Sequence, residues 1–176
     1  LRGNISILTR SEPVGVAENF YLACLETKFP YIVLCDQDDI WESDKLEVQS
    51  NILLQQPEIM LSHSDAVLID ENQTVLPLSL FGTLGVTSRE LRSINSGQAL
   101  DVFLKRNLVT GATVMMKRMV LDSAGPIPKG WIHDEWFALV ASVIGGVEAS
   151  VEKLIRYRQH DSNVIGVTKL SFKNRI

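Results

Sequence analysis

Apolar residues follow two alternating patterns along the chain. The apolar runs at 5–9 and 31–35 have the length and composition typical of strands, and strands are also predicted over 59–70, 112–117 and 147–157. Apolar residues at helical spacing predict a helix over 14–27, and further helices are predicted over 44–56, 97–105, 118–124 and 134–144. Ser43 is placed to cap the second of these helices, and Pro57 follows its end.

Strands that alternate with helices predict a single α/β domain over 1–176, with a mostly parallel sheet flanked by helices. The run 31–35 is apolar without alternation, which indicates a strand covered on both faces. In such sheets, ligands bind beyond the carboxyl ends of the strands. The stretch 71–94 lacks periodicity and contains Pro77, Gly82 and Gly85, so we predict an irregular surface excursion there.

The composition is that of a soluble globular protein, with 45% apolar and 22% charged residues among 176. A net charge of −4 weighs against nucleic acid as a partner. The two cysteines, Cys24 and Cys35, indicate neither a disulfide framework nor a zinc site, which favours the reducing cytoplasm. No apolar run reaches the roughly 18 to 20 residues that cross a bilayer.

An acidic cluster at 36–39 directly follows the run 31–35. Side chains alternate along an extended chain, so Asp36 and Asp38 are expected to point the same way. Crowded carboxylates repel one another, and a divalent cation would relieve this repulsion. A solvated acidic turn is the alternative. A haloacid dehalogenase-type phosphatase also opens with such a cluster, but its motif carries Thr or Val where Ile40 stands, and no second acidic pair ends a strand here.

Asp134 lies at a predicted helix start between Trp131 and Trp136. Indole faces suit the apolar faces of sugar rings, and a carboxylate beside them could accept a hydroxyl proton. Asp134 could equally be a helix cap. The helix start is expected to lower its pKa, which would weaken it as a base.

Other candidate positions are less specific. Gly111 precedes a predicted strand, either as an ordinary turn or as a site of close backbone approach to an acceptor. Arg156, Arg158 and His160 could contact phosphate or a metal ion. His63 is interpreted as structural.

Together these segments resemble bacterial family 2 glycosyltransferases, in particular the rhamnosyltransferase-like branch. The resemblance rests on 35–41 (CDQDDIW), 15–20 (GVAENF), 110–113 (TGAT), 133–136 (HDEW) and 157–160 (YRQH), which occur in the order expected for that branch. It spans nearly the whole chain.

The resemblance implies a GT-A (Rossmann-like) fold and an inverting, metal-assisted sugar transfer from a nucleotide-sugar donor. It implies that the donor is bound by Asp36, Asp38 and Asp39, and that Mg²⁺ or Mn²⁺ is held by Asp38 and His160. Asp134 would be the general base. The acceptor, a saccharide or lipid-linked saccharide, would lie against Gly111, Thr113, Trp131, Glu135 and Trp136. The branch implies rhamnose as donor sugar and cell-surface polysaccharide synthesis as the setting, in the cytoplasm or at the inner face of the membrane with peripheral membrane contact.

The family normally opens with strands that hold the nucleobase, whereas this chain begins where a later strand is expected. The resemblance therefore implies an N-terminally truncated domain that lacks its first nucleotide-binding strands. A non-catalytic remnant, able at most to bind carbohydrate through Trp131 and Trp136, is the alternative. The oligomeric state is not predicted.

Overall fold

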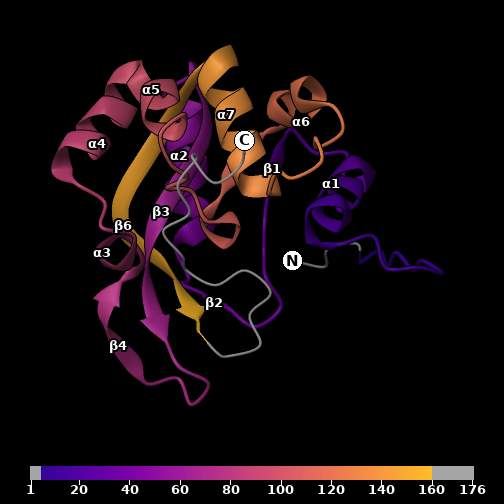
Figure 1. Ribbon diagram of the computed structural model, residues 1–176, viewed down its shortest axis with the longest axis horizontal. Coiled ribbons are helices and arrows are strands. Elements are labelled where there is room, and N and C mark those ends of the chain that lie inside the picture. The colour runs from indigo at the N-terminus through magenta and orange to yellow at the C-terminus, as the bar shows by residue number, and fades with distance from the viewer. Residues whose placement is uncertain (1–4, 160–176) are drawn as a thin grey trace.

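A computed structural model describes residues 5–159 as a curled sheet with helices on both faces (Figure 1). The described strands are β1 (Tyr31–Val33), β2 (Ile40–Trp41), β3 (Ile59–Ile69), β4 (Val75–Ser79), β5 (Met115–Lys117) and β6 (Gly146–Arg158). The helices are α1 (Val16–Glu26), α2 (Lys45–Gln55), α3 (Leu80–Leu84), α4 (Ser88–Ser93), α5 (Ala99–Phe103), α6 (Arg118–Ala124) and α7 (His133–Ile144), with a π-turn η1 (Ile94–Gln98) and a 3₁₀ turn η2 (Gly111–Thr113).

The described strands form one sheet in the order β1-β5-β3-β6-β2, with β4 paired to β3. The α/β class with flanking helices is confirmed. The expectation that most neighbouring strands are parallel is wrong, because β3–β6 is the one parallel pairing in the described residues. The long strands do share a direction, as the strand–helix alternation predicts. The short β5 lies antiparallel between β1 and β3. β2 pairs antiparallel with β6, and β4 pairs antiparallel with β3.

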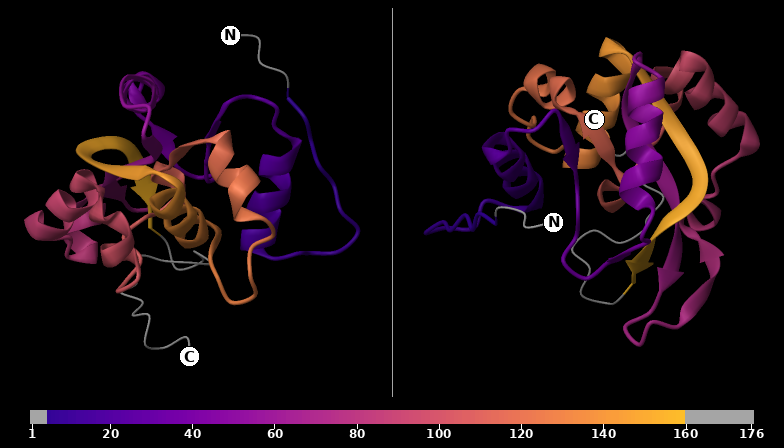
Figure 2. Two further views of the ribbon diagram at one scale, coloured as in Figure 1. Left: turned by 90° about the horizontal axis from the view of Figure 1, so that it is seen from above. Right: turned by 180° about the vertical axis from the view of Figure 1, so that it is seen from behind.

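The helices cover the two faces unequally. α1, α5, α6 and α7 build the main core on one face, centred on Phe103, Met116 and Phe137. α2 lies on the other face, where Leu53 packs on Ile59 and Met115 (Figure 2). α4 and α5 lie at one side of the molecule, and α1 and α6 at the other (Figures 1 and 2).

The predicted strand at 5–9 is absent, and Ile5 and Ile7 are exposed there. Ser43 does not cap α2, because Asp44 is the N-cap residue and makes no side-chain cap hydrogen bond. The stretch 71–94 is ordered into β4, α3 and α4 rather than irregular. Within residues 5–159, no helix is long and apolar enough to cross a membrane.

Candidate active site

Carboxylates from distant parts of the sequence gather near the end of β6. Burial raises the pKa of the Tyr157 phenol, and the negative charges of Asp36, Asp39, Asp134 and Asp38 raise it further. Asp36, Asp38 and Asp39 follow β1 in the sequence, whereas Asp134 lies in the first turn of α7. The sheet therefore brings the predicted donor-side acids and the predicted base to the same end of β6.

Asp134 is buried and held by backbone donors. The Gly111 N–H donates to its Oδ2 at 2.9 Å, and the Glu135 N–H donates to its Oδ1 at 2.6 Å. Burial raises its pKa to about 6, although these N–H groups and the Asn107 side chain pull it down. The expectation of a lowered pKa is therefore wrong, because desolvation outweighs the helix start. The N-cap position belongs to Ile132, so Asp134 is not the cap.

His133 and Gly111 fix the surroundings of Asp134. The His133 ring stacks on Phe20 of α1, with the ring centroids 4.1 Å apart and the planes 11° from parallel. A Cβ atom on Gly111 would lie 2.7 Å from His133 Nε2 and 3.6 Å from Asp134 Oδ2. Burial lowers the pKa of His133 to about 4, against the opposing effect of Asp36, so the ring is neutral at pH 7. Gly111 thus allows the close approach of α7 to the η2 turn.

Two of the predicted acceptor residues lie in the protein interior. Thr113 is fully buried, and its Oγ1 donates to the Thr110 carbonyl at 2.7 Å. Glu135 is also buried, in the first turn of α7. In this conformation both residues are placed to support the site from within rather than to line an open surface.

The acidic loop at 36–39 is tied to β6 by Arg158. The Arg158 N–H donates to Asp39 Oδ1 at 2.8 Å, and the Arg158 Nε donates to the Asp38 carbonyl at 2.9 Å. The Arg158 Nη1 reaches the carbonyls of Asp70 and Glu71, at 3.0 and 3.1 Å. Arg158 therefore clamps the loop to the β3–β4 hairpin in this conformation.

Burial and mutual repulsion disfavour the ionised forms of two loop carboxylates. Burial raises the pKa of Asp39 to about 7, with smaller contributions from Asp36 and Asp38. Burial also raises the pKa of Asp36, with smaller contributions from the charges of Asp38 and Asp134. Asp39 Oδ2 is buried without a hydrogen-bond partner among the described residues. Hard-oxygen ligands that repel one another fit Mg²⁺ or Mn²⁺.

A complete metal shell is not present in the described residues. Among residues 5–159, no three His, Cys, Asp or Glu side chains are grouped to hold a metal ion. The other predicted metal ligand, His160, lies outside the described residues. Substrate phosphates commonly complete the coordination of such ions, so a metal ion at this loop would need ligands beyond the described residues.

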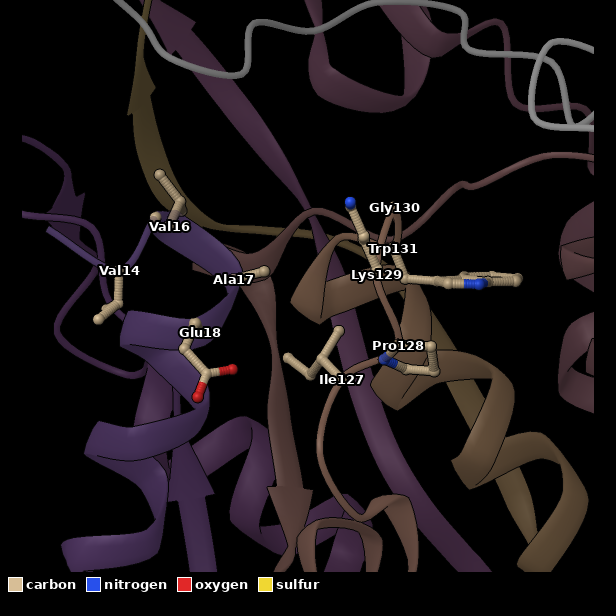
Figure 3. Close-up of a pocket in the computed structure, with 10 residues that line it drawn as sticks. Val14, Val16, Ala17, Glu18, Ile127, Pro128, Lys129, Gly130 and Trp131 are labelled. Atoms are coloured by element: carbon tan, nitrogen blue, oxygen red, sulfur yellow. The ribbon is translucent and has the colours of Figure 1, made fainter.

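The two tryptophans meet edge to face, with ring centroids 5.5 Å apart. The Trp136 Nε1 donates to the Ala124 carbonyl at 3.1 Å, which anchors the connection between α6 and α7. Trp131 lines a pocket of about 270 Å³ between the start of α1 and residues 127–131 (Figure 3). Glu18 and Lys129 also line it. Trp136 thus has a structural position, whereas Trp131 lines the pocket.

The sequence analysis missed Lys45. It is fully buried, and burial lowers its pKa to about 8. Lys45, Gln49 and Leu53 form the inward face of α2 at a spacing of four residues. Leu46 and Leu54 of the same helix are exposed, so the apolar pattern of α2 gives no signal that could have found Lys45.

The comparisons with known proteins support the fold. No protein-family model matches this chain, and no curated protein does. A solved structure of S. aureus TarS 1-349 in complex with UDP-GlcNAc matches with a TM-score of 0.54 and 14% identity. The match covers 85% of this chain, which spans about 40% of that TarS chain. This chain therefore has an α/β fold similar to that of part of TarS.

Proposed function

We propose that this protein transfers a sugar from a nucleotide-sugar donor to a saccharide acceptor with inversion, with Asp134 as the general base. The observation that supports this most is the buried Asp134 carboxylate, whose pKa of about 6 leaves it ionised but basic at pH 7. It lies in a fold similar to that of a protein solved with UDP-GlcNAc.

The chemistry would be a single displacement. The acceptor hydroxyl oxygen attacks the anomeric carbon on the face opposite the diphosphate, and its proton passes to Asp134. The new glycosidic C–O bond forms as the bond to the diphosphate oxygen breaks, and the nucleoside diphosphate leaves. The Gly111 and Glu135 N–H groups hold the carboxylate in one orientation for this step.

The donor side would be built from Asp36, Asp38 and Asp39. When bound there by Asp38, with His160 as a further ligand, Mg²⁺ or Mn²⁺ would act as a Lewis acid on the leaving diphosphate. Arg158 would keep the loop in place through its contacts with Asp38 and Asp39.

The acceptor side would be the surface around Trp131. Its pocket of about 270 Å³ has an aromatic wall and both charge signs, through Glu18 and Lys129. Rhamnose as the donor sugar, and a lipid-linked acceptor at the inner face of the membrane in cell-surface polysaccharide synthesis, are the finer parts of the proposal. They rest on the resemblance of the five sequence motifs to one family branch.

The test is a panel of nucleotide sugars, including UDP-GlcNAc and nucleotide-activated rhamnose, with saccharide acceptors and with or without Mn²⁺. Release of nucleoside diphosphate and formation of product are measured for the wild type and for Asp134→Asn. We expect the variant to bind donor normally while transfer falls by roughly 10²–10⁴. Asp101→Asn, a change at an exposed position of α5, is the matched control.

Unchanged transfer by Asp134→Asn would remove Asp134 from its role. Failure of the wild type to bind or turn over any donor would contradict the enzymatic proposal. Phosphate release from a simple phosphomonoester would instead favour a phosphatase.

A non-catalytic carbohydrate-binding protein is the second candidate, and the pocket beside Trp131 is the observation that favours it. It predicts that a saccharide quenches tryptophan fluorescence and that Trp131→Ala abolishes this effect, with no donor turnover in the wild type.

A further inference from the structure

A buried lysine lies beside β2, the strand that follows the acidic loop. Lys45 is fully buried, although lysine ordinarily keeps its ammonium group in water. Its Nζ lies 5.4 Å from the centroid of the Trp41 ring in β2 and donates to Gln49 Oε1 at 2.9 Å. Burial lowers the pKa of Lys45, and the negative charge of Asp39 in the loop partly opposes this effect. The ammonium group is therefore buried between α2 and the Trp41 ring, two residues after the acidic loop.

Gln49 links Lys45 to β3 and to the η2 turn. Its Nε2 donates to the Thr113 carbonyl at 2.8 Å and to the Ser62 carbonyl at 3.2 Å. Thr113 ends the η2 turn, and Gly111 begins it. The Gly111 N–H is the donor that holds Asp134 Oδ2. Buried polar contacts thus connect Lys45 through Gln49 to the turn that orients Asp134.

We propose that Lys45 is a positioning residue for sugar transfer, which holds the acidic loop by its charge and the η2 turn through Gln49, so that donor-side and acceptor-side carboxylates keep one relative geometry. This proposal rests on the proposed function. Its physical basis is that Lys45 supplies a positive charge from within the protein, next to the strand that follows the acidic loop. A small displacement of the acidic loop or of Asp134 would lower the rate of sugar transfer, because transfer requires the base and the donor to be aligned.

Lys45→Met is the informative change, because methionine keeps the unbranched apolar stem and removes the charge. Burying an ammonium group is unfavourable, so its removal is not expected to weaken the fold as a whole. The loss should instead be local. We expect amide hydrogen exchange to become at least about tenfold faster in segments 35–41 and 109–114, with 137–141 in the core of α7 unchanged.

Kinetics provide the second measurement. For Lys45→Met we expect kcat to fall at least about tenfold with a smaller change in donor KM, because alignment is lost rather than binding surface. Gln49→Leu leaves the charge and breaks the connection to Thr113, so it should speed exchange in 109–114 and lower kcat in the same way. Lys105→Met, at an exposed position, is the matched control and should change neither exchange nor kinetics.

The outcomes separate the two proposals. Wild-type exchange in both segments of Lys45→Met, or equally faster exchange throughout the core, would overturn the positioning role. Should Lys45→Met fail to fold, Gln49→Leu still decides, and wild-type exchange and kinetics in that variant would overturn the role. If the wild type transfers no sugar from any donor, the proposed function fails, whereas the exchange measurement still supports or overturns the hold of Lys45 on the two segments.

Discussion

A methyl group added at Gly111 should disturb the site through one identifiable contact. The Cβ of Gly111→Ala would lie 2.7 Å from His133 Nε2, whereas ordinary non-bonded contacts begin near about 3.5 Å. The ring or the turn must therefore move by nearly an ångström. The ring is held by stacking on Phe20, and the turn is held by the hydrogen bond from its N–H to Asp134. Neither can shift without losing a contact.

The expected penalty follows from this crowding. Inserting a methyl group into a packed interior costs about 1–3 kcal/mol. For a chain of this size, each kcal/mol lowers the melting temperature by about 2–4 °C, so the expected drop is about 2–12 °C. Gly82→Ala in α3 is the control, since its Cβ would meet Ser79 Oγ no closer than 3.4 Å. That variant should melt within a few degrees of the wild type.

A double-mutant cycle identifies the cause. His133→Ala removes the ring that the new methyl group meets, so most of the penalty of Gly111→Ala should disappear in that background. Thermal unfolding of the four proteins measures the coupling. An equal drop in both backgrounds would refute the contact with His133 as the cause. No drop in either would show that the turn accommodates a side chain.

Three further predictions concern buried charge and the loop clamp. The pKa of Asp134 is raised from 3.8 to about 6, so the contribution of this group to stability should fall as pH rises through that range. Asp134→Asn does not titrate, so it should remove this part of the pH dependence measured by urea unfolding, and an unchanged dependence between these two pKa values would contradict the assignment. The pKa of His63 is lowered from 6.5 to about 4 by burial, so the contribution of this group to stability should fall as pH drops between these values. His63→Leu should flatten this decline, with a remainder from His133, and an unchanged acid profile would argue against the assignment. Arg158→Ala loses three carbonyl contacts of the side chain, so hydrogen exchange at 36–40 and 70–74 should rise together, and a rise at neither would refute the clamp.

Local patterns predicted the elements that depend on near neighbours. α6 occupies the predicted residues, and β3 and α7 differ from their predicted bounds by one residue at one end. Such helices and strands are set by spacing of apolar side chains along a few turns or residues. The capping box of α4, in which Thr87 and Glu90 bond each other's backbone N–H, was also present in the sequence, although the stretch was interpreted as irregular.

Strand direction and the role of Lys45 depend on residues far apart in the sequence. β5 runs antiparallel between β1 and β3, and nothing within its three residues encodes which neighbours it pairs with. Gln49 reaches Thr113 across 64 positions, which makes Lys45 part of the site rather than a surface residue of α2. Periodicity within one helix cannot show such a contact.

The sequence by itself determined which acids the chain carries after a buried strand and at a helix start, and in what order. The tertiary structure alone decided which groups contact those acids and in which direction their pKa values shift. It places the Arg158 backbone against Asp39 over 119 positions and Gly111 against Asp134 over 23 positions. Desolvation there raises the pKa of Asp134, whereas its position at the helix start alone predicts the opposite. The physical reason is that a carboxyl group responds to every dipole, charge and excluded water molecule around it, and most of these come from elsewhere in the chain.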